Sequence, residues 1–362
     1  MSISLTRALQ ILIFIFLLFT TLHFAKPFLI PLVFAGLLSM LLLPLSERLE
    51  RKISRSVSIL VCISLLLLFV AAVGFLISWQ VADLASNAAK IEQQVTKNIE
   101  NIRKTISESL GISHQEQQKI VQKQRSSGSG QMTAFATTIV SSLAGILGNS
   151  VLALVYIFLF LYFRDRIKTF ILRISKRKEN EETKEVLQKS RLVAQKYLSG
   201  LAMMIVCLWI LYGIGFTIVG VKNALFFAIL CGLLEIVPFI GNLTGTALTA
   251  FMVMAQGGST GMLVGVLATY AVVQTFQTYI LEPLVVGSNV SINPLFTIVV
   301  IVLGEFVWGI PGMILAIPLL GIVKIICDHV PALQPIGYLI GQDKKEENPK
   351  WLDKIKMMLK RR

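Results

Sequence analysis

The sequence has 362 residues, of which 55% are hydrophobic and only 15% are charged. Its mean hydropathy of +0.74 lies outside the range of soluble proteins, so a water-soluble globular fold is excluded. The apolar residues come in blocks of about 17 to 25, and a helix of about 20 residues spans the hydrocarbon core of a bilayer. The sequence therefore predicts an all-α polytopic integral membrane protein with about eight transmembrane segments.

The net charge of +14 is concentrated beside apolar blocks. Residues 164–196 hold 11 Lys and Arg against 5 acids, and residues 324–362 hold 9 against 5. This asymmetry is typical of cytoplasmic loops rather than of a surface that binds nucleic acid. We therefore expect both termini in the cytoplasm, membrane lipids as partners and no nucleic acid.

Residues 1–79 predict three N-terminal transmembrane helices, at about 8–24, 28–45 and 57–79. A tight hairpin is expected at residues 25–28, and the lack of a small-x-small cleavage site indicates that the first helix is retained. Basic residues at 48–55 mark the next turn as cytoplasmic.

Residues 80–136 predict an extracytoplasmic insert made of an amphipathic helix and a linker. Apolar residues recur every three or four positions from Val81 to Leu110, which is one stripe of a helix. The stripe fits either a surface lying on the bilayer or on the protein's own helices, or a face for self-association. The chain then predicts a fourth transmembrane helix at 137–163, a basic cytoplasmic connector at 164–196, a C-terminal transmembrane core at 197–328 and a basic cytoplasmic tail at 329–362.

The C-terminal core holds the candidate functional residues. Between Lys222 and Lys324 there is no Lys, Arg, Asp or His, and the acids are three glutamates. A carboxylate at the bilayer centre costs about 2.5 to 3.5 kcal/mol on insertion scales. Such acids fit proton or cation coupling or contact with a polar solute. They also fit bonding to backbone N–H groups freed at helix breaks or, for Glu282 and Glu305, a position at the membrane interface. The candidate solute- or ion-binding residues are Glu235, Asn242, Gln274, Gln277, Glu282, Asn289, Asn293 and Glu305.

Proline and glycine residues interrupt the same core. Two of these breaks follow a glutamate, Glu235 and Glu305. Secondary transporters build midplane sites from discontinuous helices. Residues 222–256 and 295–326 fit either single kinked spanning helices or hairpins of two half-helices that enter and leave on one side. The candidate hinge residues are Pro238, Gly241, Pro283, Gly287, Pro294, Gly309, Pro311, Gly312 and Pro318.

Enzyme and metal motifs are absent from the sequence. There is no GxxxxGK[ST] phosphate loop, no HExxH and no CxxC, and the three histidines lie far apart. We therefore expect no enzyme activity, no metal site and no cofactor other than a coupling H⁺ or Na⁺.

Three stretches resemble the autoinducer-2 exporter family of bacterial PerM-like permeases. They are PFLIPLVFAGLLSMLLLPLSERLER, FFAILCGLLEIVPFIGN and LEPLVVGSNVSINPLFTIVVIVLGEFVWGIPGMILAIPLLGIVKII. The resemblance covers nearly the whole chain to about residue 328, and the last stretch carries the most specific order of Glu, Pro and Gly residues.

The resemblance implies a protein of the bacterial inner membrane that moves a small polar solute without ATP and forms homo-oligomers. Members of the family are associated with export of autoinducer-2, a polyhydroxylated furanone, and others look like sodium/proton antiporters. Three functions stay open. They are a secondary exporter with alternating access around the broken helices, a cation/proton antiporter that uses membrane-embedded Glu, and an envelope scaffold whose external helix binds a partner.

Overall fold

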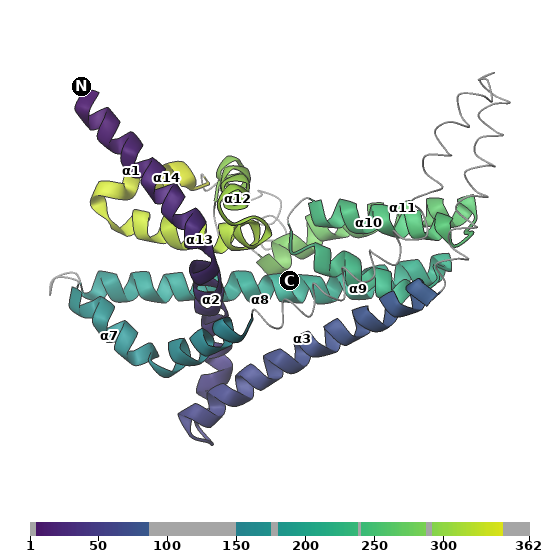
Figure 1. Ribbon diagram of the computed structural model, residues 1–362, viewed down its shortest axis with the longest axis horizontal. Helices are drawn as coiled ribbons and strands as arrows, with labels where there is room; N and C mark the ends of the chain where they lie inside the picture. Colours follow the sequence, from purple (N-terminus) through teal and green to yellow (C-terminus); the bar gives the residue numbers. More distant parts are fainter. Residues whose placement is uncertain (1–4, 87–149, 175–179, 238–239, 287–291, 343–362) are drawn as a thin grey trace, which may run out of the picture.

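A computed structural model describes residues 5–86, 150–174, 180–237, 240–286 and 292–342 (Figure 1). Within these ranges every regular element is a helix, apart from one antiparallel bridge between Ile292 and Gly341. Five of the described helices are long and apolar enough to cross a membrane, at Lys26–Leu49, Arg55–Ala82, Glu181–Val219, Thr260–Glu282 and Ile310–His329. The prediction of an all-α polytopic membrane protein is confirmed. Most of the expected insert, the start of the fourth helix and the tail from residue 343 lie outside the described residues.

The two N-terminal helices, α1 (Leu5–Phe24) and α2 (Lys26–Leu49), meet at a bend. The Ala25 N–H donates to the Thr21 carbonyl, and the Leu29 N–H donates to the Ala25 carbonyl. Helical hydrogen bonding therefore continues through the junction, and Figure 1 shows α2 continuing away from the end of α1. The tight hairpin expected here is wrong, because Pro27 falls in the first turn of α2, where its missing N–H does not interrupt the helix.

The helices α2 and α3 (Arg55–Ser86) pack with the helix Ser150–Tyr162 around a small apolar core. At one end of this core lies a set of ion pairs, the corner clamp, formed by Glu50, Arg55, Arg164 and Asp165. The Arg164 guanidinium donates to both Glu50 oxygens, at 2.8 and 2.6 Å, and Arg55 donates to Asp165 at 2.7 Å. Burial disfavours ionised Glu50, but hydrogen bonds from Arg164 and Ser46 outweigh it and lower the pKa of Glu50 below its ordinary value.

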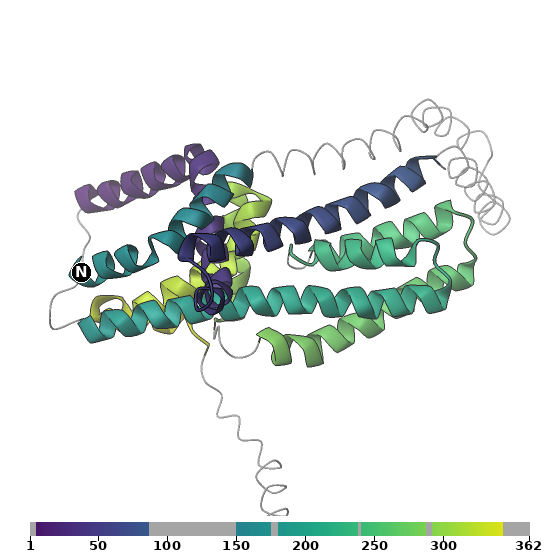
Figure 2. The same ribbon diagram turned by 90° about the horizontal axis from the view of Figure 1, so that it is seen from below.

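The longest of the described helices, α8 (Asn180–Val219), contacts α2, α7 (Arg164–Ile174), α9 (Ala224–Leu234), α11 (Thr260–Phe276) and α13 (Ile310–His329). The part of the basic connector from residue 180 and the following membrane span, which the sequence separates by composition, share this single helix. In Figures 1 and 2, α13 lies beside the N-terminal half of α8, and α9 and α11 lie beside its C-terminal half.

Two helical hairpins pack against α8. In the first, α9 (Ala224–Leu234) is followed by α10 (Ile240–Ala255), and Gly245 lies against Cys231, so the arms are antiparallel. In the second, α12 (Pro294–Trp308) is followed by α13 (Ile310–His329), and the backbones of Gly304 and Gly312 touch. Both regions are therefore hairpins rather than single kinked helices, although α13, with 20 residues, is long enough to cross a bilayer.

The turn of the second hairpin depends on Gly309, whose φ of 66° is a left-handed conformation that favours glycine. The side chain of Trp308, the last residue of α12, donates to the Leu22 carbonyl of α1 at 3.0 Å. The tip of this hairpin is thus tied to the N-terminal helix.

The helix α11 (Thr260–Phe276) runs antiparallel to α8 and continues as a π-helix, η2 (Gln277–Val286). Gly215 of α8 lies against Thr269, and Gly265 of α11 lies against Val219. Small residues at such positions let two membrane helices approach closely. The chain ends its described part with η4 (Pro331–Leu333) and α14 (Gln334–Ile340), which fold back onto the end of α13.

Candidate functional site

Five polar side chains form a hydrogen-bonded chain inside the C-terminal half, here named the polar network: Tyr212, Glu235, Asn242, Gln274 and Gln277. The Tyr212 hydroxyl donates to Asn242 Oδ1 at 2.6 Å, and Asn242 Nδ2 donates to Gln274 Oε1. Asn242 Nδ2 also lies 3.4 Å from Gln277 Oε1, and Gln277 Nε2 donates to Glu235 Oε1 at 2.6 Å. Tyr212 is 0% exposed and Gln277 is 1% exposed, so the centre of the network is closed off from the surroundings.

The network draws one residue from each of the elements that meet here. Tyr212 comes from α8, Asn242 from the first turn of α10, and Gln274 from α11. Glu235 caps the C-terminus of α9, and Gln277 begins η2. Because Gln274 and Gln277 are three residues apart, their side chains share one face of the helix.

Close packing in the first hairpin positions the two residues on either side of its break. A Cβ atom on Gly241 would overlap the Leu234 carbonyl at the end of α9. The glycine therefore lets α10 begin directly against that end, which brings the neighbouring Asn242 toward Glu235. Apolar residues of α8, α9 and α11 surround the network, among them Phe216, Phe227 and Val273.

One carboxylate oxygen of Glu235 takes no part in the hydrogen bonds of the network. Its Oε1 accepts from Gln277, whereas Oε2 is buried and has no hydrogen-bond partner within the described part of the chain. A buried acceptor without a donor is costly, about 1 to 3 kcal/mol. This oxygen is therefore available to a proton, a cation or a solute hydroxyl.

The other predicted site residues lie at the edge of the network or outside it. Glu282 is exposed on η2 and interacts with Gln277. Glu305 is exposed on α12, and no hydrogen bond among the described residues joins it to the network. Asn293 caps α12 by accepting from the Leu295 N–H at 2.9 Å, so its side chain has a structural partner. Asn289 falls outside the described residues.

The predicted hinge residues lie in different parts of the hairpins and helices. Gly241, Gly309 and Gly312 lie where the hairpin arms meet or turn. Pro294 and Pro311 lie in the first turns of α12 and α13, where proline is tolerated. Pro318 is inside α13 and Pro283 is inside η2, while Pro238 and Gly287 fall outside the described residues.

Sequence reasoning missed Tyr212. A tyrosine in the middle of an apolar membrane helix, away from the interfacial belts where tyrosine is common, is the signal that could have found it. Its importance depends on the partner Asn242, which is 30 residues away in the sequence.

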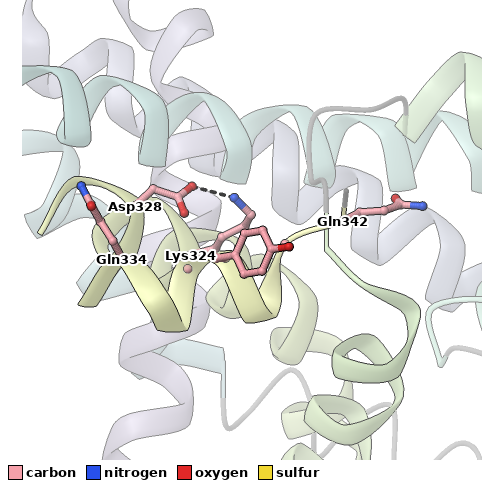
Figure 3. Close-up of a pocket in the computed structure, with 7 residues that line it drawn as sticks. Lys324, Asp328, Gln334 and Gln342 are labelled. Carbon is pink, nitrogen blue, oxygen red and sulfur yellow. Dashed lines mark hydrogen bonds and ion pairs between the residues drawn. The ribbon is translucent and has the colours of Figure 1, made fainter. Parts of the chain in front are cut away.

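A separate hollow of about 330 Å³ lies at the other end of the molecule, between the end of α13 and α14 (Figure 3). Lys324 and Asp328 line it and pair with each other at 2.6 Å, and Gln334 and Gln342 lie at its rim. Its two charges are thus satisfied internally, and it has no residue in common with the polar network. Among the described residues, no three His, Cys, Asp or Glu side chains gather as a metal centre would require.

An all-helical membrane protein whose broken-helix hairpin carries a buried polar network has the construction of a solute transporter. The family model for AI-2E family transporters matches residues 11–332, and the chain belongs to that family. It is therefore a transporter rather than an enzyme.

Three bacterial relatives, each a candidate transport protein, match over most of their lengths. YueF of Bacillus subtilis is 27% identical over 311 residues, which cover 81% of this chain and 82% of that protein. YrrI of the same organism is 24% identical, covering 84% and 87%. YhhT of Escherichia coli K12 is 22% identical, covering 88% and 89%.

Proposed function

We propose that the protein is a secondary transporter of a small polar solute and that the polar network is its solute-contacting site. The observation that carries the proposal is the convergence of Tyr212, Asn242, Gln277 and Glu235 on one buried point at the break of the first hairpin. Amides, a phenol and a carboxylate offer both donors and acceptors, which suit a neutral polyhydroxylated molecule such as autoinducer-2 better than an apolar one.

Alternating access follows from the way in which the network is built. Its bonds join the first hairpin to α8 and to α11, so a solute that replaces the bond between Tyr212 and Asn242 loosens the hairpin from α8. Binding to one arrangement in preference to the other is what shifts a conformational equilibrium. The first hairpin is thus the moving element of the proposal.

Cation/proton antiport is the second candidate, and the free Glu235 Oε2 favours it. In this case the carboxylate exchanges a proton for a cation, and the neighbouring amide oxygens of Gln274 and Gln277 complete the coordination. Glu282 and Glu305 are exposed, and each lacks such a buried oxygen in the described part of the chain.

The orientation and assembly belong to the same proposal. The clustered positive charge supports cytoplasmic termini in the bacterial inner membrane. A homo-oligomer is expected from the family, and cross-linking of the purified protein in membranes tests it.

The experiment is flux through the purified protein in liposomes under an imposed proton gradient, with labelled autoinducer-2 and Na⁺ followed in parallel. The variants are Glu235→Gln and, as the matched control, Glu305→Gln. Gradient-dependent autoinducer-2 flux that Glu235→Gln abolishes supports the solute transporter, and Na⁺ flux alone supports the antiporter. If neither moves through folded protein, the proposal fails.

A further inference from the structure

The helix α7 (Arg164–Ile174) begins where an apolar helix ends. The helix Ser150–Tyr162 precedes it with one residue between, and hydrogen bonds from the Phe163 N–H to Leu159 and from the Ile167 N–H to Phe163 run across the junction. None of the α7 side chains is buried. The chain therefore passes directly from a candidate membrane segment into a helix that lies on the surface of the protein.

An apolar stripe runs along α7. Phe163, Ile167, Phe170 and Ile174 are spaced by four, three and four residues, which places them on one face. All four are exposed, and Phe170 and Ile174 are 64% and 70% exposed. A contiguous exposed stripe of this kind marks a contact with another apolar phase.

The charges of α7 fall into two groups. Arg164 and Asp165 belong to the corner clamp, where they pair with Glu50 and Arg55. Arg166, Lys168 and Arg173 have no acidic partner in the described ranges.

The two free arginines border the apolar stripe. They are seven residues apart, or about two helical turns, so both lie along the same edge of the stripe. The guanidinium of Arg166 also lies over the Phe163 ring, 5.7 Å from its centroid. Lys168 lies on the opposite face of the helix.

We propose that α7 lies in the headgroup layer of the membrane, with its apolar stripe at the acyl boundary and with Arg166 and Arg173 bound to anionic phospholipid. A basic helix with one apolar face binds such an interface, and guanidinium groups hold phosphate by paired hydrogen bonds. Continuity with the preceding apolar helix favours lipid over a protein partner, because it holds α7 at the membrane boundary. Since the corner clamp ties the same helix to the junction of α2 and α3, a change in lipid contact reaches the bundle through Arg164 and Asp165.

The test uses the full chain in phosphatidylcholine vesicles with and without phosphatidylglycerol. A spin label is placed at Phe170→Cys on the stripe and, as the matched control, at Lys168→Cys on the opposite face. Wild-type protein labelled in parallel gives the background from the four native cysteines, three of which are buried. The rates at which molecular oxygen and a water-soluble nickel complex collide with each label then report how deep the label lies in the membrane.

We expect the label at position 170 to meet oxygen and to be protected from the nickel complex, and the label at position 168 to show the reverse. In vesicles that contain phosphatidylglycerol, we expect a higher ratio of membrane-immersed to water-exposed label at position 170. Neutralising the two arginines in Arg166→Gln/Arg173→Gln lowers this ratio by about fivefold per arginine and removes the dependence on phosphatidylglycerol. Lys168→Gln leaves both unchanged.

Two results overturn the proposal. Equal access of the nickel complex to positions 168 and 170 places α7 in water. Protection of position 170 from both oxygen and nickel, without dependence on phosphatidylglycerol, shows that protein covers the stripe instead.

Discussion

The two hairpins share a sequence pattern but have different surroundings. Each has a glutamate one turn or so ahead of a Gly/Pro break, and in each a glycine permits close contact between the arms. Glu235 of the first hairpin is drawn into the polar network, whereas Glu305 of the second is exposed on α12. The second hairpin packs its inner faces through apolar residues such as Ile301 and Met313. A local motif therefore offers a site, and the helices packed against it decide whether a site forms.

Replacing each glutamate by glutamine gives the largest expected difference between the hairpins. Glu235→Gln is expected to lower gradient-driven flux by tenfold or more, because it removes the titratable group of the network. The amide can still accept from Gln277, so the protein stays folded. Glu305→Gln is expected to retain flux in the same liposome assay, and equal losses in both variants would refute the contrast.

The glycine contacts test what the hairpins have in common. Gly241→Ala and Gly312→Ala each place a Cβ against a backbone carbonyl of the other arm. Both are expected to lower the free energy of unfolding by about 3 kcal/mol, measured in mixed micelles. Gly74→Ala in α3 is the control, since nothing lies within 4 Å of its added Cβ, and a helical alanine there is neutral or stabilising. A harmless Gly241→Ala would contradict the close approach at the network.

The corner clamp lies outside both hairpins and predicts a pH dependence of stability of its own. The pKa of Glu50 is lowered in the folded protein, so its stabilisation is present above the unfolded carboxyl pKa of about 4.3 and is lost as the pH falls through the folded value. The Glu50 and Arg164 side chains are only 18% and 21% exposed. We expect Glu50→Gln to cost about 2 kcal/mol of unfolding free energy at pH 7 and to flatten the loss of stability at acidic pH. A variant with the wild-type pH profile would argue against the clamp.

Removing one hydroxyl from the network gives the smallest effect. Tyr212→Phe leaves Asn242 Oδ1 without its donor, which is expected to cost about 1 kcal/mol of unfolding free energy. Thr217→Val on the same helix is the control, because the exposed Thr217 hydroxyl donates only to the Gly213 carbonyl of its own helix. The network is of no structural consequence if the two variants unfold alike.

Individual residues show how much of the fold and of the site can be predicted from the sequence. Composition and block length predicted the all-α membrane fold, because insertion into a bilayer leaves a direct signature in hydropathy. The absence of other charges singled out Glu235, and the spacing of Gln274 and Gln277 placed them on one face. The same reasoning kept Glu305 among the candidates and passed over Tyr212, since it treats each segment separately. The expected hairpin at Ala25 was wrong because a proline in the first turn of a helix does not by itself reverse the chain.

The sequence by itself determined that this protein is a multi-pass membrane protein, and that helix breaks follow Glu235 and Glu305 in its C-terminal half. These properties depend on the order of residues along the chain and on the cost of polar groups in lipid. Only the tertiary structure decided that residues 222–256 and 295–326 fold as hairpins, and that Tyr212 and Gln277 meet at the first of them. These pairings join helices that are distant in sequence, so they depend on which surfaces pack together, and no local pattern specifies that.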